Sequence, residues 1–178
     1  MKFKILIILF CSAILVIKSC KKDQELPLSD DATTPYVLTQ KAGMPPFALP
    51  ADNPLTNQGV LLGRMLFYDP IVSLDSSISC ASCHRLPAAF TDGRTVSSFH
   101  ENEFARNAPT LANLAWSPYF MSEGGVPTLE LQALGPIHEK HELSLSMEEV
   151  VGRLNSKSNY AELSKAAYGR ELDAFVIT

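Results

Sequence analysis

Apolar residues recur along this chain at the spacing of helices rather than of strands. The clearest case covers residues 56–69, where one helical face is apolar and Pro70 ends the run. The apolar residues of that face are Val60, Leu61, Met65 and Leu66. Small and polar residues at positions 73–79 then predict a loop.

Further helices are predicted in the second half of the chain. Ser146 and Glu149 have the spacing of a capping box, which predicts a helix from there to about residue 155. Another helix is expected over residues 158–168, with Gly169 at its end. Shorter helices are expected at residues 107–114 and 128–134. No segment alternates convincingly between apolar and polar positions, so the predicted fold class is all-α.

The first residues have the pattern of an export signal. Lys2 and Lys4 precede an apolar run over residues 5–17, which is too short to span a membrane well. The run closes on Ile17-Lys18-Ser19-Cys20, which resembles the lipobox of bacterial lipoproteins. We therefore expect residues 1–19 to be a signal peptide and Cys20 to carry lipid. The alternative is an ordinary secretory signal in which Cys20 is incidental.

Residues 20–54 have the composition of a tether. Their prolines deny a regular helix, so we expect this segment to supply distance between a membrane surface and a domain over residues 55–178. These prolines are Pro27, Pro35, Pro45, Pro46, Pro50 and Pro54. The net charge of the chain is −4, and removal of the basic signal would make it more negative. This balance argues against nucleic acid as a partner.

The strongest chemical signal is Cys80-Ala81-Ser82-Cys83-His84. Two thiols three residues apart, followed directly by an imidazole, form the attachment signature of c-type haem. Cys80 and Cys83 would form thioether bonds to the two vinyl groups of the porphyrin. His84 would then bind the iron from the proximal side.

Two other interpretations of the cysteine pair are a redox dithiol and a zinc site. A redox dithiol would need a βαβ pattern, which is not visible, and a zinc site would have to borrow the distant His138 and His141. Of the four cysteines, Cys11 would leave with the signal and Cys20 would carry lipid, so none remains for a disulfide. Lipidation and covalent haem attachment both occur outside the bacterial inner membrane. We therefore expect a lipid-anchored protein on the periplasmic side.

Four further motifs accompany the haem signature in order. They are Leu62-Gly63-Arg64-Met65-Leu66-Phe67-Tyr68-Asp69-Pro70, Phe90-Thr91-Asp92-Gly93, Arg106-Asn107-Ala108-Pro109-Thr110-Leu111 and Leu129-Glu130-Leu131-Gln132-Ala133-Leu134-Gly135-Pro136. With them, the chain from about residue 58 resembles bacterial di-haem cytochrome c peroxidases and their MauG-like relatives. The resemblance implies a cytochrome c-like fold with one haem c in this N-terminal, peroxidatic half. A second haem would lie in a C-terminal domain, before which we expect this sequence to be truncated.

The resemblance also implies roles for five side chains. His84 would be the proximal iron ligand, and His100 the distal ligand of the resting state, which moves away on activation. Gln132 would orient peroxide, Glu142 would carry its proton, and Asn107 would help to bind calcium between the two domains. From the residues alone, His100, Gln132 and Glu142 could instead be a solvated loop histidine, a core amide and a solvated helix end.

Ser122 is a departure from the family pattern. Relatives usually have a tryptophan there, on the electron route between the haems, whereas the single tryptophan of this chain is Trp116. A hydroxymethyl group has no accessible one-electron oxidation, so efficient transfer between haems is in doubt.

Three functions stay open at this point. The first is a lipid-anchored di-haem peroxidase that reduces hydrogen peroxide to water with electrons from a small cytochrome c or cupredoxin. The second is MauG-like oxidation of a protein or small-molecule substrate. The third is mono-haem electron transfer, which needs a permanent sixth ligand from His100, Met65, Met121 or Met147. The oligomeric state is also open, with a homodimer as one option.

Overall fold

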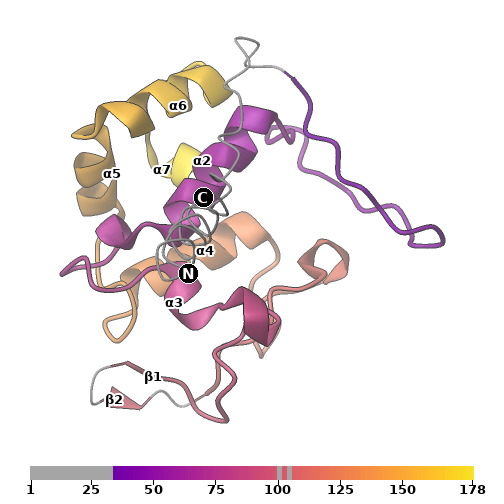
Figure 1. Ribbon diagram of the computed structural model, residues 1–178, viewed down its shortest axis with the longest axis vertical. Helices are drawn as coiled ribbons and strands as arrows, with labels where there is room; N and C mark the ends of the chain where they lie inside the picture. Colours follow the sequence, from indigo (N-terminus) through magenta and orange to yellow (C-terminus); the bar gives the residue numbers. More distant parts are fainter. Residues whose placement is uncertain (1–33, 100–101, 104–105) are drawn as a thin grey trace, which may run out of the picture.

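The computed structural model describes residues 34–99, 102–103 and 106–178, and it is a helical protein (Figure 1). Its α-helices are α2 (Asn57–Tyr68), α3 (Cys80–Cys83), α4 (Leu129–His138), α5 (Met147–Asn155), α6 (Ser158–Tyr168) and α7 (Ala174–Ile177). Short 3-10 turns are η2 (Pro70–Val72), η3 (Leu86–Ala88) and η4 (Leu114–Trp116). Within the described residues, β structure is limited to the antiparallel two-residue strands β1 (Ser98–Phe99) and β2 (Asn102–Glu103) and three isolated bridges. The predicted all-α class is confirmed.

Helix α2 begins and ends where the sequence predicted. The Thr56 hydroxyl accepts a hydrogen bond from the Gly59 amide at 3.0 Å, which satisfies one of the free amides of the first turn. After Tyr68 the backbone becomes extended at Asp69, the residue before a proline, as the steric demand of the pyrrolidine ring requires. Leu62 and Leu66 on its apolar face are buried.

The predicted start of α5 and the predicted end of α6 are also confirmed. Ser146 and Glu149 cap each other reciprocally at the start of α5, with the Ser146 amide donating to the Glu149 carboxylate at 2.8 Å. Helix α6 ends at Gly169, whose φ of 66° lies in the left-handed region that glycine adopts without strain.

The helix predicted over residues 107–114 is wrong. That segment is irregular, and its only regular structure is the single turn η4 at its end. Pro109 removes one backbone donor, and Asn113 takes a left-handed φ of 62°. The Thr110 hydroxyl instead donates to the Ala89 carbonyl at 2.6 Å. The segment is thereby tied to the loop that follows the haem motif.

The helix predicted over residues 128–134 is longer than expected, because α4 continues through Pro136 to His138. Two carbonyls near its end are satisfied from outside the helix. The Leu143 amide donates to the Pro136 carbonyl at 3.1 Å, and the Leu145 amide donates to the Ile137 carbonyl at 2.9 Å. The chain therefore turns back on α4 and brings residues 139–145 beside it.

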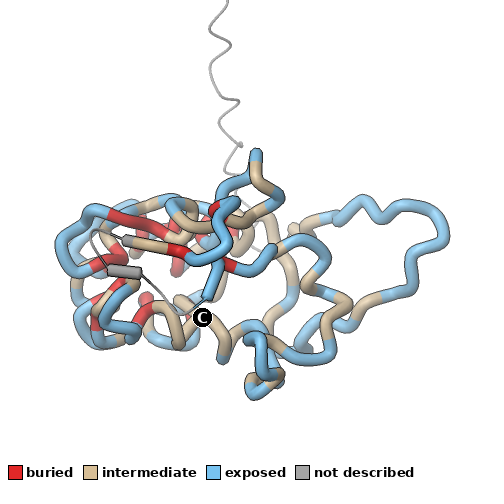
Figure 2. Tube along the Cα trace, turned by 90° about the horizontal axis from the view of Figure 1, so that it is seen from below, coloured by how far each residue is buried: buried red, intermediate tan, exposed pale blue. Residues whose placement is uncertain are grey.

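One hydrophobic cluster joins the helices. Helix α2 packs against α6 and α3, and α5 contacts α4, α6, α7 and η2. Figure 2 shows the buried residues gathered over this helical side of the molecule. The buried members are Leu62, Leu66, Val72, Ile78, Ile137, Leu143, Leu145, Val150, Leu154, Tyr160, Leu163, Leu172 and Val176. The haem motif lies at one edge of this core, because Cys80 packs against it.

Polar contacts fix the segment between α2 and the haem motif. The Tyr160 hydroxyl on α6 donates to the Asp69 carboxylate at 2.7 Å, while the other carboxylate oxygen accepts from the Ile71 amide at 2.9 Å. The Arg153 guanidinium on α5 donates to the carbonyls of Ser73 at 2.6 Å and Leu74 at 2.8 Å. Two helices distant in sequence therefore position the loop that leads into α3.

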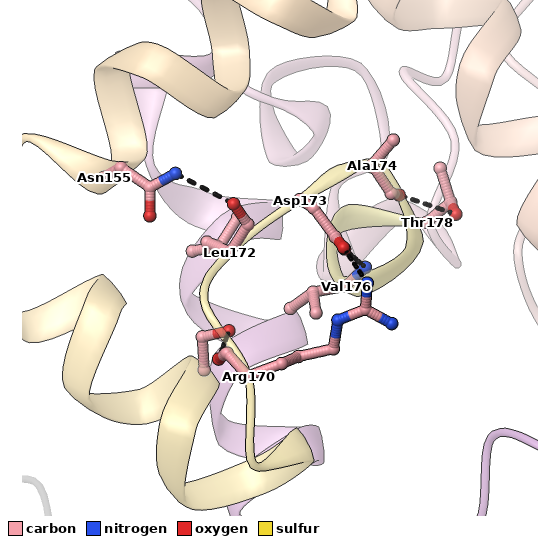
Figure 3. A network of polar contacts seen from close by, with 8 residues as sticks. Asn155, Arg170, Leu172, Asp173, Ala174, Val176 and Thr178 are labelled. Carbon is pink, nitrogen blue, oxygen red and sulfur yellow. Dashed lines mark hydrogen bonds and ion pairs between the residues drawn. The ribbon is translucent and has the colours of Figure 1, made fainter.

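A second network closes the C-terminal side of the core (Figure 3). The Asn155 amide donates to the Leu172 carbonyl at 2.8 Å. The Asp173 carboxylate pairs with Arg170 and accepts from the Val176 amide at 3.1 Å, which starts α7. These bonds hold the buried Leu172 and Val176 against the helices.

Residues 34–54, the described end of the predicted tether, contain no α-helix, as their prolines predicted. The segment projects as an indigo loop in Figure 1. Its base is closed by the Tyr36 amide on the Leu55 carbonyl at 3.0 Å, and the Trp116 indole donates to the Pro45 carbonyl at 2.9 Å. No helix in the described part of the chain is long and apolar enough to cross a membrane. The predicted signal and Cys20 lie outside the described residues.

Candidate haem site

Helix α3 presents the two cysteines one turn apart. The Ser79 amide donates to the Ser82 hydroxyl at 3.0 Å and the His84 amide donates to the Cys80 carbonyl at 2.9 Å, so a single helical turn is closed at both ends. Residues at i and i+3 lie on one side of a helix. Cys80 and Cys83 are both free and half-buried. Their spacing is therefore suited to attachment along one edge of a porphyrin.

His84 is held in one tautomer by the backbone. Its Nδ1 lies 2.9 Å from the Phe90 carbonyl oxygen, which can only accept, so Nδ1 carries the hydrogen and Nε2 keeps its lone pair. Ala89 and Phe90 take left-handed φ values of 54° and 59°, which turn this carbonyl toward the ring. A hydrogen bond of this kind orients metal-bound histidines and raises their basicity. The free Nε2 is thus the atom that would bind iron.

A buried carboxylate holds the loop that follows. Although burial raises the pKa of Asp92, hydrogen bonds from the Ser97 hydroxyl and the Arg94 amide outweigh it and lower that pKa below its ordinary value. Ser97 also accepts from the Ala108 amide at 2.7 Å. The network joins the two ends of the segment that contains His100, which itself lies outside the described residues.

Glu142 is electrostatically coupled to the haem motif. Burial raises the pKa of the Cys80 and Cys83 thiols, and the negative charge of Glu142 raises both further. Burial first, and then the charge of Glu139, raise the pKa of Glu142 itself. The structure therefore brings a half-buried carboxyl from the turn after α4 near the thiols of α3. A raised pKa suits a carboxyl that takes and returns a proton.

Gln132 lies on α4 in contact with a methionine. Its Nε2 is 3.7 Å from the Met121 sulfur, within the range of a hydrogen bond to sulfur. No pattern in the sequence indicates this contact. In the structure, a β-carbon at Gly135, one turn later on α4, would lie 2.7 Å from the Met121 methyl. The sequence also did not predict the contact of His84 with the Phe90 carbonyl, because any residue type carries a backbone carbonyl.

The other predicted residues are exposed. Asn107 is exposed, and nothing in the structure tests its predicted calcium role. His138 and His141 are exposed, and His138 Nδ1 lies 2.7 Å from the Leu134 carbonyl of its own helix. No three His, Cys, Asp or Glu side chains in the described ranges gather as a metal-ion site, so the zinc interpretation finds no support. Ser122 is exposed in a turn.

The residues present fit a covalently attached haem. Two free thiols one helical turn apart and an imidazole with a free Nε2 are the donors that this group takes. The candidate sixth ligands Met65 and Met147 pack against the hydrophobic core, whereas the Met121 sulfur faces Gln132.

A family model for di-haem cytochrome c peroxidase matches residues 57–178. The chain belongs to this family. It is 41% identical over 123 residues to the methylamine utilization protein MauG of Methylorubrum extorquens, covering 68% of this chain and 35% of that protein. It is 34% identical over 129 residues to the cytochrome c peroxidase Ccp of Escherichia coli, covering 69% of this chain and 28% of that protein.

A solved structure supports the same assignment. A MauG-like protein associated with microbial copper homeostasis superposes with a TM-score of 0.72 at 31% identity, over 80% of this chain and 45% of that one. The chain thus spans about a third of the curated relatives (35% and 28%) and under half of this structure. Membership of the family supports haem as the group that Cys80, Cys83 and His84 hold.

Proposed function

We propose that this chain forms the peroxidatic haem domain of an enzyme that reduces hydrogen peroxide to water. Electrons would come from a small cytochrome c or cupredoxin, through a second haem domain. The observation that carries this proposal is the position of Glu142, a half-buried carboxyl with a raised pKa whose charge reaches both haem cysteines. Carboxyls with a perturbed pKa are typical of sites that transfer protons.

Each side chain has a distinct task in this scheme. The bound haem supplies the redox chemistry and an open coordination position for peroxide. Cys80 and Cys83 fix the porphyrin edge, and His84, oriented by the Phe90 carbonyl, holds the proximal side. Glu142 takes the proton from the inner oxygen of peroxide and returns it to the departing oxygen. Gln132 orients the peroxide without titrating.

His100 completes the proposal as a gate on the distal side. By its resemblance to the family histidine, it would occupy the open position at rest and leave on activation. We also propose calcium binding at Asn107, between this domain and the second one. Both roles rest on the family pattern, with calcium removal by a chelator as the direct test of the latter.

A MauG-like oxidase is the second candidate. The 41% identity to a MauG protein and the fit to a MauG-like structure support it. The two candidates differ in stoichiometry. A peroxidase oxidises two one-electron donor proteins for each peroxide, whereas a MauG-like enzyme leaves the donor reduced and modifies its own substrate.

The proposal is tested by Glu142→Gln in haem-loaded protein, with peroxide reaction followed by stopped-flow absorption. Loss of the proton carrier should slow the reaction roughly 10²- to 10⁴-fold. Glu148→Gln, an exposed carboxylate on the first turn of α5, is the matched control and should react as the parent does. A Glu142→Gln rate within about threefold of the parent would remove Glu142 from the mechanism.

We further propose that the protein is anchored by lipid at Cys20 on the periplasmic side of a bacterial membrane. Residues 1–19 would direct export and residues 20–54 would separate the domain from the bilayer. Cell fractionation checks this directly. Cys20→Ser should move the protein from the membrane to the soluble periplasmic fraction, and an unchanged membrane fraction would contradict the lipid anchor.

A further inference from the structure

We propose that Met121 is a positioning residue: its sulfur sets the orientation of the Gln132 side-chain amide, which faces peroxide in the proposed function. The inference rests on the function proposed above and adds a residue to its site. The main observation behind it is the contact between Met121 Sδ and Gln132 Nε2 at 3.7 Å. These residues belong to different segments, a turn after η4 and the middle of α4, so the contact is tertiary.

The backbone aims Met121 at α4. Met121 has a φ of 62°, and its carbonyl accepts from the Gly124 amide at 3.1 Å in a tight turn. The flanking residues Phe120 and Val126 pair across this turn as an antiparallel bridge. A methionine in the left-handed region is strained, and such strain is retained where surrounding structure requires it. The turn thereby places a long side chain against the helix.

Helix α4 is shaped to receive this side chain. Gly135 lies one turn after Gln132, and a β-carbon on it would come within 2.7 Å of the Met121 methyl. Glycine inside a helix costs about 0.5–1 kcal/mol relative to alanine. The space it leaves is filled by Met121, whose sulfur then reaches the amide. The sulfur and the methyl of Met121 thus both lie beside α4.

A thioether can select one orientation of an amide. Sulfur is an acceptor without a hydrogen to donate, so it faces the NH₂ end of Gln132 and turns the carbonyl oxygen away. One amide hydrogen and the carbonyl oxygen stay available for peroxide. Without this contact the amide is free to rotate by half a turn, which exchanges donor and acceptor at the site.

The other described methionines lack this arrangement. Met65 and Met147 pack against the hydrophobic core, and Met44 lies in the loop over residues 34–56. Met121 is 44% exposed. Met44 is similarly exposed and therefore provides the matched control.

The test is a double-mutant cycle between Met121→Leu and Gln132→Leu in haem-loaded protein. The reduced protein is bound to carbon monoxide, whose infrared stretching band reports hydrogen-bond donors beside it without any peroxide turnover. We expect Met121→Leu to shift this band and to slow the peroxide reaction about threefold. In the Gln132→Leu background the same substitution should change neither quantity. Met44→Leu should behave as the parent, and thermal unfolding verifies that each variant is folded.

Two results would overturn the proposal. One is an unshifted band in Met121→Leu, and the other is an equal shift with and without Gln132, which would mean that Met121 acts by itself. The infrared cycle decides the role of Met121 even if the parent does not react with peroxide. A failure to react with peroxide would count against the proposed function alone.

Discussion

The hydrogen bond between Tyr160 and Asp69 should stabilise the segment that joins α2 to the haem motif on α3. The substitution Tyr160→Phe measures the contribution of this bond to stability. Tyr160 is only 2% exposed, and its hydroxyl donates to the Asp69 carboxylate at 2.7 Å. The substitution removes one oxygen and keeps the ring in the core. The contribution of the ring to packing therefore cancels between the two proteins.

The magnitude follows from the type of bond. A hydrogen bond to a charged group contributes about 1.5–3 kcal/mol to stability. Because Asp69 is half-exposed, water can donate to its carboxylate in the variant and offset part of this loss. We expect a loss of about 1–2 kcal/mol in the free energy of unfolding. In a domain of this size that lowers Tm by about 4–8 °C. Tyr168→Phe loses a longer bond, 3.3 Å to the neutral amide oxygen of Asn53, and should cost less than half as much.

The assay is urea unfolding of haem-loaded parent, Tyr160→Phe and Tyr168→Phe, followed by circular dichroism. An equal loss in the two variants would refute the special status of the Asp69 bond. So would a Tyr160→Phe loss below about 0.5 kcal/mol, the level expected for a surface substitution.

Two further predictions concern the distal side. Because the folded protein raises the pKa of Glu142 above its ordinary value of 4.5, stability falls as pH rises through the interval between these values. Glu142→Gln, which never ionises, should thus unfold at higher temperature than the parent at neutral pH, with the advantage lost below pH 4.5; a constant difference across pH would contradict this origin. His100→Gly should react faster with peroxide in stopped-flow measurements, and a slower or unchanged reaction would count against a gating histidine.

Local signals predicted most helices correctly. The helix wrongly predicted over residues 107–114 lies where the chain makes contacts with a distant segment. Thr56, Ser146 and Gly169 act within one turn of the chain, so their effect is visible in the sequence. Residues 107–114 were predicted to be helical but are irregular, and the Thr110 hydroxyl instead bonds to the Ala89 carbonyl. That partner lies too far away in sequence for any local pattern to reveal it.

The sequence by itself predicted a haem attachment site, because Cys80, Cys83 and His84 lie within five residues and one helical turn brings them together. It also indicated the family, which the family model matches over residues 57–178. Only the tertiary structure decided which groups surround them. Glu142 raises the pKa of the Cys83 thiol because the chain folds back beside α4, and the Phe90 carbonyl selects the tautomer of His84. Such proximity depends on packing between distant segments, which no spacing along the chain contains.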